Sequence, residues 1–235
     1  MKIEGKTILI SGASRGIGFA LVEEALKRGA KQIYAGARTA FTHPDRRVTV
    51  MTLNVTDEAQ IRTAAEKAGS LDILINNAGV LFYDDLKDRT MVERHLATNF
   101  FGMHDMIQAF LPLLIRSKGA VVNNLSILAL APLPPTASYC ISKAAAFSMT
   151  QSLRAFLAGR GVKVHAVLAG PVDTDLIRHL DVPKASPASV AQCIFDGIEK
   201  GDEDIFPDPQ SALIAEGWSG SAAKTLEQRF AALVR

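Results

Sequence analysis

Short apolar runs alternate with longer stretches of helical hydrophobic spacing along this chain. The runs that predict strands cover residues 7–10, 31–35, 48–53, 73–75, 120–125, 163–168 and 205–206. Helical spacing predicts helices at 19–28, 90–115, 138–159 and 188–199. Two more helices are predicted, one that begins after its cap Asp57 and ends at Ala68, and a C-terminal one that ends near Val234. Because strands and helices alternate, we expect an α/β fold with a doubly wound parallel sheet and helices on both faces. No repeat or linker divides the chain, so we expect one domain over residues 1–235.

The composition is that of an ordinary globular protein. Hydrophobic residues make up 48% and charged residues 21% of the 235 residues, and the net charge is +2. This charge gives no electrostatic footprint for nucleic acid, and apolar runs such as 127–133 are too short to span a bilayer. The N-terminus lacks a signal-peptide core, and two cysteines build no disulfide framework. We therefore expect a cytoplasmic protein with no nucleic-acid or membrane partner.

Three glycines follow closely on the first predicted strand. The stretch Ser11-Gly12-Ala13-Ser14-Arg15-Gly16-Ile17-Gly18 leads directly into the first predicted helix. Glycine allows a turn with positive φ and lets a phosphate approach the backbone closely. The helix N-terminus adds free amides and the positive end of the helix dipole. The stretch therefore predicts a pyrophosphate site, and a tight turn that binds nothing is the simpler alternative.

Two arginines indicate which dinucleotide suits this turn. A free ribose 2′-hydroxyl is usually held by Asp or Glu about 20 residues beyond the glycines. Here the second predicted strand ends in Gly36-Ala37-Arg38, without a carboxylate. Arg38 and Arg15 together suit a 2′-phosphate, which guanidinium groups hold with charge-assisted hydrogen bonds. Unless both are merely surface arginines, we expect NADP(H), with NAD(H) less well suited.

Tyr139 and Lys143 are four residues apart in a predicted helix, so they share one face. A lysine ammonium beside a phenol favours the phenolate and lowers its pKa from about 10. Such a tyrosine can donate and accept a proton near neutral pH. Alone the pair is a weak signal, because many such pairs lie on solvated helix faces. Ser126 lacks a Gly-x-Ser-x-Gly elbow and the five histidines show no ligand spacing, which disfavours a hydrolase and a metal site.

Taken together, the motifs resemble the short-chain dehydrogenase/reductase family, of the type that prefers NADP. In chain order they are Gly12-x-x-x-Gly16-Ile17-Gly18, Asn76-Asn77-Ala78-Gly79, Asn99, Ser126, Tyr139-x-x-x-Lys143 and Gly170-Pro171-Val172-x-Thr174. Their order and separations fit the family's core pattern, although each motif alone is unspecific. Ser11 stands where threonine is commoner, and Asn54 stands where the family often has aspartate near the adenine. The resemblance implies a single-domain Rossmann-like fold.

The resemblance also implies roles for four catalytic residues. Tyr139 would pass a proton to or from the carbonyl oxygen, and Ser126 would hydrogen-bond that oxygen. Lys143 would hold the nicotinamide ribose and lower the Tyr139 pKa, and Asn99 would support a water that relays protons. The residues expected at the cofactor are Gly12, Ser14, Arg15, Gly16, Ile17, Gly18, Arg38, Asn54, Val55, Asn77, Ala78, Gly79, Tyr139, Lys143, Pro171, Val172 and Thr174.

The substrate is expected to be a small, uncharged and largely hydrophobic molecule, because no arginine stands among the expected wall residues to clamp a carboxylate. These are Val80, Leu81, Phe82, Leu128, Leu130, Leu133, Pro134, Leu176 and Ile177, with Ser126 and Tyr139 at the reacting oxygen. We expect an NADP(H)-dependent oxidoreductase that interconverts a ketone or aldehyde and its alcohol. A non-catalytic NADP-binding sensor or regulator on the same fold is the alternative. The resemblance further implies a homodimer or homotetramer, and residues 175–187 suggest a short lid over the substrate.

Overall fold

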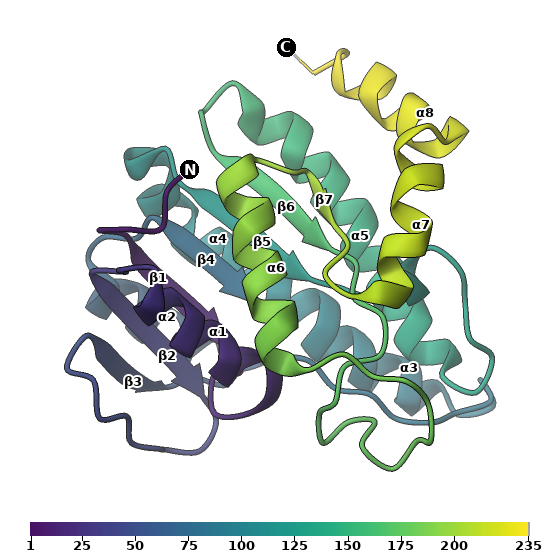
Figure 1. Ribbon diagram of the computed structural model, residues 1–235, viewed down its shortest axis with the longest axis horizontal. Coiled ribbons are helices and arrows are strands. Elements are labelled where there is room, and N and C mark those ends of the chain that lie inside the picture. The colour runs from purple at the N-terminus through teal and green to yellow at the C-terminus, as the bar shows by residue number, and fades with distance from the viewer. Residues whose placement is uncertain (235) are drawn as a thin grey trace.

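Seven strands form one parallel sheet in a computed structural model of the chain, which describes residues 1–234. The strands are β1 (Thr7–Ser11), β2 (Gln32–Ala37), β3 (Val48–Thr52), β4 (Ile73–Asn76), β5 (Ala120–Asn124), β6 (Lys163–Val167) and β7 (Asp204–Ile205). They lie side by side in the order β3-β2-β1-β4-β5-β6-β7, and every neighbouring pair is parallel (Figure 1). The predicted parallel α/β sheet is confirmed.

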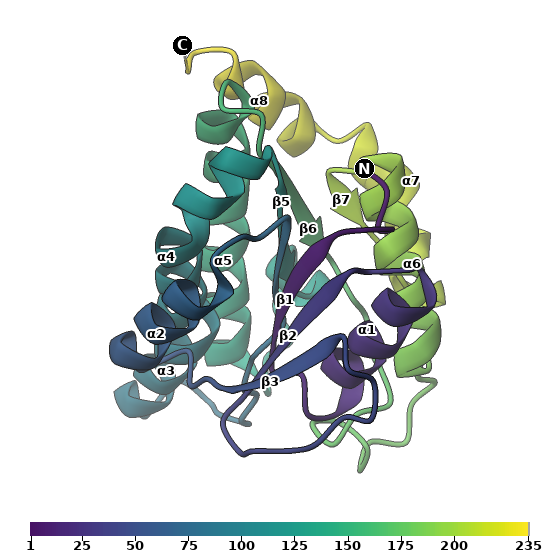
Figure 2. The same ribbon diagram turned by 90° about the vertical axis from the view of Figure 1, so that its left-hand side faces the viewer.

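Helices cover both faces of this sheet (Figure 2). They are α1 (Gly16–Lys27), α2 (Glu58–Ala68), α3 (Arg89–Leu96), α4 (Gly102–Ser117), α5 (Ala137–Ala158), α6 (Pro187–Lys200), α7 (Pro209–Ser219) and α8 (Ala222–Ala231). A π-helical turn, η1 (Ala97–Phe101), joins α3 to α4, and a 3-10 turn, η2 (Ile127–Ala129), follows β5. Helices α2, α4 and α5 pack on one face, and α1 and α6 pack on the other (Figure 2).

Each face of the sheet packs in its own hydrophobic core. Successive side chains of a central strand belong to different cores, because a strand alternates its side chains between the two faces. In β1, Ile8 and Ile10 belong to the core beneath α1 and α6, whereas Leu9 belongs to the core beneath α2, α4 and α5. In β4, Ile75 likewise belongs to the core beneath α1 and α6, and Leu74 belongs to the core beneath α2, α4 and α5. Both faces of the sheet are therefore buried, which explains why these strands are continuous apolar runs in the sequence.

Two predicted helices differ in the structure. The helix predicted at 90–115 is interrupted by η1, where Asn99 turns into the protein interior. The single C-terminal helix predicted from the sequence is two helices, because the hydroxyl of Ser221 caps α8 by accepting from the Lys224 amide at 3.1 Å. Trp218, at the end of α7, packs against Phe147 and is therefore a structural residue.

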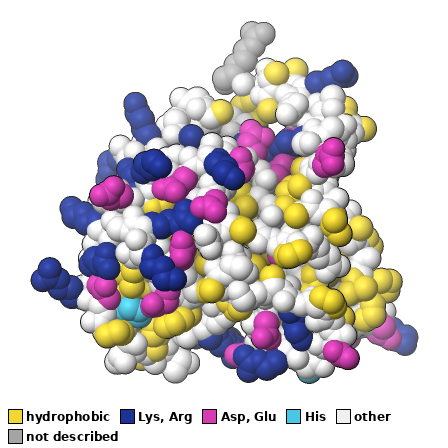
Figure 3. Space-filling model, viewed as in Figure 1, with side chains coloured by type: hydrophobic (Ala, Val, Ile, Leu, Met, Phe, Trp, Pro, Cys, Tyr) yellow, Lys and Arg dark blue, Asp and Glu magenta, His cyan; other side chains and the backbone are white. Residues whose placement is uncertain are grey.

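The strand order reverses between β1 and β4, and the carboxyl ends of these strands form the crevice in which α/β sheets bind ligands. On the face shown in Figure 3, basic and acidic side chains intermingle on the side of α1 and β2, and hydrophobic ones gather around α7. Among residues 1–234, no helix combines the length and apolar character needed to cross a bilayer.

Candidate active site

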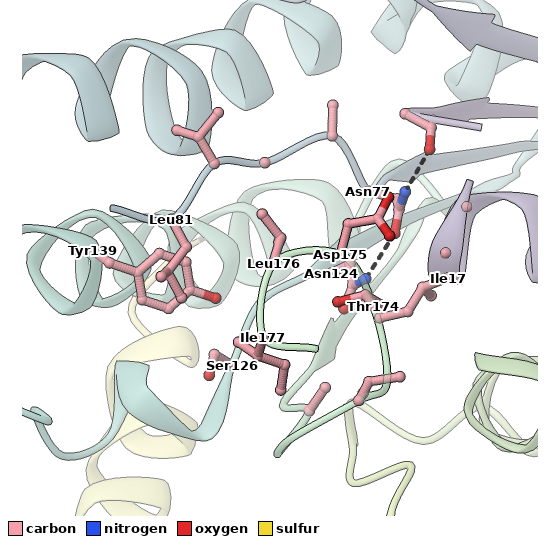
Figure 4. Close-up of a pocket in the computed structure, with 18 of the residues that line it drawn as sticks. Ile17, Asn77, Leu81, Asn124, Ser126, Tyr139, Thr174, Asp175, Leu176 and Ile177 are labelled. Carbon is pink, nitrogen blue, oxygen red and sulfur yellow. Dashed lines mark hydrogen bonds between the residues drawn. The ribbon is translucent and has the colours of Figure 1, made fainter. Parts of the chain in front are cut away.

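A cavity of about 1020 Å³ opens at the carboxyl edge of β1 and β4. Every residue predicted to bind the cofactor lines it, from Gly12 in the glycine turn to Thr174 after β6. Leu128 and Leu133 line it too, as does Ser126, which is labelled in Figure 4. This volume is at the upper end of the range for small-molecule sites, so it can hold a dinucleotide together with a small substrate.

The glycine turn fits a pyrophosphate. Gly12 has a φ of +67°, and a Cβ at this position would lie 2.9 Å from Ala78 Cα. A Cβ on Gly18 would lie 2.1 Å from the Gly12 carbonyl oxygen. Arg15 precedes α1 without a side-chain cap, and the first turn holds no acidic residue. The first amides of α1 are therefore not capped by a side chain, which suits an anion.

Arg15 and Arg38 both lie exposed at the rim of this cavity. Arg15 Nη1 forms an ion pair with Asp175 Oδ2 at 2.9 Å, and Asp175 also pairs with Arg178 at 2.8 Å. Since 64% of the Arg15 side chain is exposed, this pair is weak. An anion at the rim can therefore compete with Asp175 for Arg15.

Amide side chains join the ends of three strands beneath the cavity (Figure 4). Asn77 Nδ2 donates to the carbonyl oxygens of Ser11 at 3.0 Å and Gly12 at 3.2 Å. Asn124 Nδ2 donates to Asn77 Oδ1 at 2.9 Å, while Asn124 Oδ1 is buried without a hydrogen-bond partner among the described residues. Sequence reasoning missed Asn124, although its place at the end of β5, two residues before Ser126, could have indicated it.

Ser126, Tyr139 and Lys143 come together from β5 and α5. Ser126 follows β5, and its Oγ accepts from the Leu128 amide at 3.1 Å, which leaves its proton available for donation into the cavity. Tyr139 and Lys143 share a face of α5, and Lys143 Nζ lies 5.6 Å from the Tyr139 ring centroid. Lys143 Nζ donates to the Asn124 carbonyl oxygen at 2.9 Å. The geometry brings one phenol, one hydroxyl and one cation to the same wall.

The pKa of Tyr139 corrects one prediction from the sequence. Burial raises the pKa of Tyr139 to about 12, and the hydrogen bond with Ser126 opposes this only in part. Burial also lowers the pKa of Lys143 to about 8. The sequence predicted a Tyr139 pKa below that of a free phenol, but in the protein alone it lies above, because burial outweighs the hydrogen bond with Ser126. At pH 7 the phenol is protonated and Lys143 is mostly charged.

Asn99 does not line the cavity but lies fully buried behind it. Its Oδ1 accepts from the Val80 amide at 2.9 Å, and its Nδ2 donates to the Val80 carbonyl at 3.0 Å and to Ser142 Oγ at 3.0 Å. The wider π-helical turn brings this side chain inward, as π-turns often do at functional sites. Asn99 therefore connects the segment after β4 to the helix that carries Tyr139.

The far end of the cavity is mostly apolar, and six of the nine predicted wall residues line it. These six are Val80, Leu81, Leu128, Leu133, Leu176 and Ile177. Three predictions were wrong: Phe82 packs on His95, Leu130 packs on the core, and Pro134 is exposed outside the cavity. Phe82 points away from the cavity because side chains alternate along an extended segment, and its neighbours Leu81 and Tyr83 line the cavity instead.

Comparison with known proteins places this site in a family. The family model described as short chain dehydrogenase matches residues 6–184. The chain belongs to the short-chain dehydrogenase family. A solved short chain dehydrogenase from Burkholderia cenocepacia in complex with NADP is 35% identical, with a TM-score of 0.89 over 97% of this chain and 98% of that one.

Curated relatives agree with this assignment. The short-chain dehydrogenase PC-15 of Penicillium crustosum is 39% identical over 73% of this chain and 68% of its own length. The 3-oxoacyl-acyl-carrier-protein reductase FabG of Vibrio cholerae is 32% identical over 77% of this chain and 79% of its own length. This short-chain dehydrogenase is therefore an NAD(P)-dependent oxidoreductase. Within residues 1–234, no group of His, Cys, Asp and Glu side chains could hold a metal ion.

Proposed function

We propose that this short-chain dehydrogenase interconverts an uncharged, hydrophobic ketone or aldehyde and the matching alcohol with NADP(H), and that Tyr139 is its general acid and base. The observation that carries the proposal is the convergence of Tyr139, Ser126 and Lys143 on the wall between the glycine turn and an apolar chamber. A nicotinamide bound in the cavity would supply or accept the hydride.

The chain's own residues would supply the proton and the charge stabilisation. Burial raises the pKa of Tyr139 to about 12, so at neutral pH the phenol carries the proton that reduction of a carbonyl consumes. Ser126 has its Oγ fixed by the Leu128 amide, so its proton can be donated to the same substrate oxygen. Lys143, mostly charged at pH 7, would stabilise the phenolate left after proton transfer.

The preference for NADP(H) over NAD(H) is supported by the two arginines at the cavity rim. Arg38 follows β2 where an acidic residue would serve a 2′-hydroxyl, and Arg15 lines the same cavity in a weak pair with Asp175. Both would bind a 2′-phosphate with charge-assisted hydrogen bonds.

The apolar chamber supports an uncharged substrate. Leu81, Leu176 and Ile177 lie around the space beside Tyr139 (Figure 4), and Leu128 lines the same cavity. Among residues 1–234, no arginine or lysine other than Lys143 lines that end. A carboxylate there would lose its hydration without gaining a charged partner. A homodimer or homotetramer also belongs to this proposal, on the ground of family resemblance. So does a cytoplasmic location, because two cysteines build no disulfide framework.

Cofactor oxidation measured by absorbance over a panel of ketones, aldehydes and short keto-acids tests the proposal. Tyr139→Phe should lower kcat by about 10²–10⁴-fold while leaving the Kd for NADPH within twofold. Tyr34→Phe is the matched control, because the Tyr34 hydroxyl donates to the Ala68 carbonyl at 3.3 Å, away from the cavity. Full turnover by Tyr139→Phe would refute the role of Tyr139, and preference for keto-acids would refute the substrate class.

A further inference from the structure

The helix that carries Tyr139 and Lys143 lacks a cap from its own sequence. Thr136 precedes α5, but its side chain makes no capping hydrogen bond. Its hydroxyl instead donates to the Leu133 carbonyl at 3.1 Å. The first amides of a helix have no partner within the helix and need an acceptor from elsewhere.

Asp84 supplies that acceptor from the segment after β4, a distance of 54 positions along the chain. Its Oδ1 accepts from the Ser138 amide at 3.1 Å, and its Oδ2 accepts from the Ser138 hydroxyl. The Asp84 amide donates to the Pro135 carbonyl at 3.1 Å, so the backbone is held there as well. Burial tends to raise the pKa of Asp84, but the hydrogen bonds from Ser138 outweigh it and hold that pKa below its usual value. A carboxylate at a helix N-terminus also interacts favourably with the helix dipole.

Ser138 directly precedes Tyr139, so the bonds to Asp84 act on the turn that presents the phenol. On the other side of this contact, Leu81 and Tyr83 belong to the same extended segment as Asp84 and line the cavity. The Phe82 amide, between these two residues, donates to His95 Nε2 at 3.0 Å, and this bond fixes the segment. Asp84 therefore connects the substrate wall directly to the first turn of α5.

We propose that Asp84 is a positioning residue, which sets the position of the Tyr139 hydroxyl relative to the substrate wall by capping α5 from outside that helix. The inference rests on the proposed function, in which Tyr139 transfers the proton. Proton transfer requires the phenol within hydrogen-bond reach of the substrate oxygen. A displacement of about 1 Å can reduce turnover by up to about 10²-fold.

A purely structural cap is the competing explanation, and the chain contains a matched control for it. Asp88 caps α3 with the same chemistry: its carboxylate accepts from the Thr90 amide at 2.8 Å and from the Thr90 hydroxyl at 2.7 Å. None of the α3 residues lines the cavity. Loss of either cap should lower the melting temperature by a similar few degrees. Only the loss of the Asp84 cap should change catalysis.

The experiment compares Asp84→Ala, Asp84→Asn and Asp88→Ala in the full chain, with the melting temperature, the Kd for NADPH by fluorescence, and kcat and KM on the best substrate of the panel. We expect Asp84→Ala to lower kcat at least 10-fold with the NADPH Kd within twofold. Asp88→Ala should keep kcat within twofold. Asparagine retains one carbonyl acceptor for the Ser138 amide, so Asp84→Asn should restore kcat to within about threefold of the wild type.

An Asp84→Ala protein whose kcat matches that of Asp88→Ala overturns the inference. If Asp84→Ala does not fold, Ser138→Ala decides, because it removes one of the two bonds and leaves the carboxylate in place. A kcat lowered at least threefold supports the inference, and an unchanged kcat overturns it. Tyr139→Phe in parallel separates the two proposals. If it retains turnover, the proposed function fails; if it loses turnover while Asp84→Ala does not, only the positioning role fails.

Discussion

Replacing Lys143 with methionine removes a buried charge while keeping an unbranched side chain of similar length. Lys143 is 5% exposed, and its Nζ donates to the Asn124 carbonyl oxygen. No carboxylate forms an ion pair with it among residues 1–234. The fold therefore holds this ammonium against the cost of desolvation, and the substitution should remove that cost.

The magnitude follows from the pKa of Lys143, which burial lowers from 10.5 to about 8. Below pH 8 the lysine is charged in both the folded and the unfolded chain, so the full cost of desolvating the ammonium lowers the stability of the fold. Between about pH 8 and pH 10.5 the unfolded chain retains a proton that the folded chain has lost, so stability rises with pH. At about 1.4 kcal/mol for each pH unit, the gain across this window is roughly 3 kcal/mol, and the methionine variant lacks it.

Urea unfolding of the wild type and Lys143→Met at pH 7, 8.5 and 10 measures this difference. At pH 7 the variant should be at least as stable as the wild type, by up to roughly 3 kcal/mol less the lost hydrogen bond. By pH 10 most of that advantage should have disappeared. All other titrating groups are common to both proteins, so their contributions cancel. Lys31→Met is the control, because Lys31 is exposed and its charge remains in water.

Two results would refute this reasoning. The first is a stability difference between the wild type and Lys143→Met that stays constant from pH 7 to pH 10. The second is a variant that is less stable than the wild type at pH 7, because the relief of desolvation should exceed the loss of the hydrogen bond to Asn124, which is worth about 1 kcal/mol. In either case burial would not be what sets the pKa of Lys143.

Two further predictions concern the cofactor half of the cavity. The double variant Arg15→Ala/Arg38→Ala should raise the Kd for NADPH by about 10²-fold and that for NADH by less than threefold, because only a 2′-phosphate loses its charged partners; equal losses in titration calorimetry would contradict this. Gly18→Ala should abolish NADPH binding and lower the melting temperature, since its Cβ would lie 2.1 Å from the Gly12 carbonyl oxygen. Gly217→Ala, with no atom within 4 Å of the new Cβ, should instead be neutral or stabilising by about 0.5–1 kcal/mol. Equal behaviour of the two glycine variants would show that the close packing of the turn has no role.

The parts of the site that depend on local sequence could be predicted. The glycine turn was recognisable because its spacing and its place between a strand and a helix are contiguous in the chain. Tyr139 and Lys143 share a face because they are four residues apart on one helix. The continuous apolar runs of β1 and β4 followed from burial on both faces of the sheet.

Contacts between distant segments could not be predicted. No pattern in the sequence links Asp84 to Ser138, or Asn77 to Asn124, because these pairs meet only when separate strands and helices pack. The π-helical turn at Asn99 was missed for a related reason. It places a polar side chain against Val80 and Ser142, whereas the apolar spacing of 90–115 alone predicts a regular helix.

By itself, the sequence determined where the strands and most of the helices lie along the chain, the glycine turn between β1 and α1, and the identity of the four residues expected to carry the reaction. The tertiary structure decided their electrostatic state: it surrounds Tyr139 and Lys143 with protein, raising the pKa of the first to about 12 and lowering that of the second to about 8. The physical reason is that desolvation depends on what packs around a group from every direction. The four-residue spacing of Tyr139 and Lys143 along one helix shows only that these two side chains are neighbours, and it does not show how deeply either is buried.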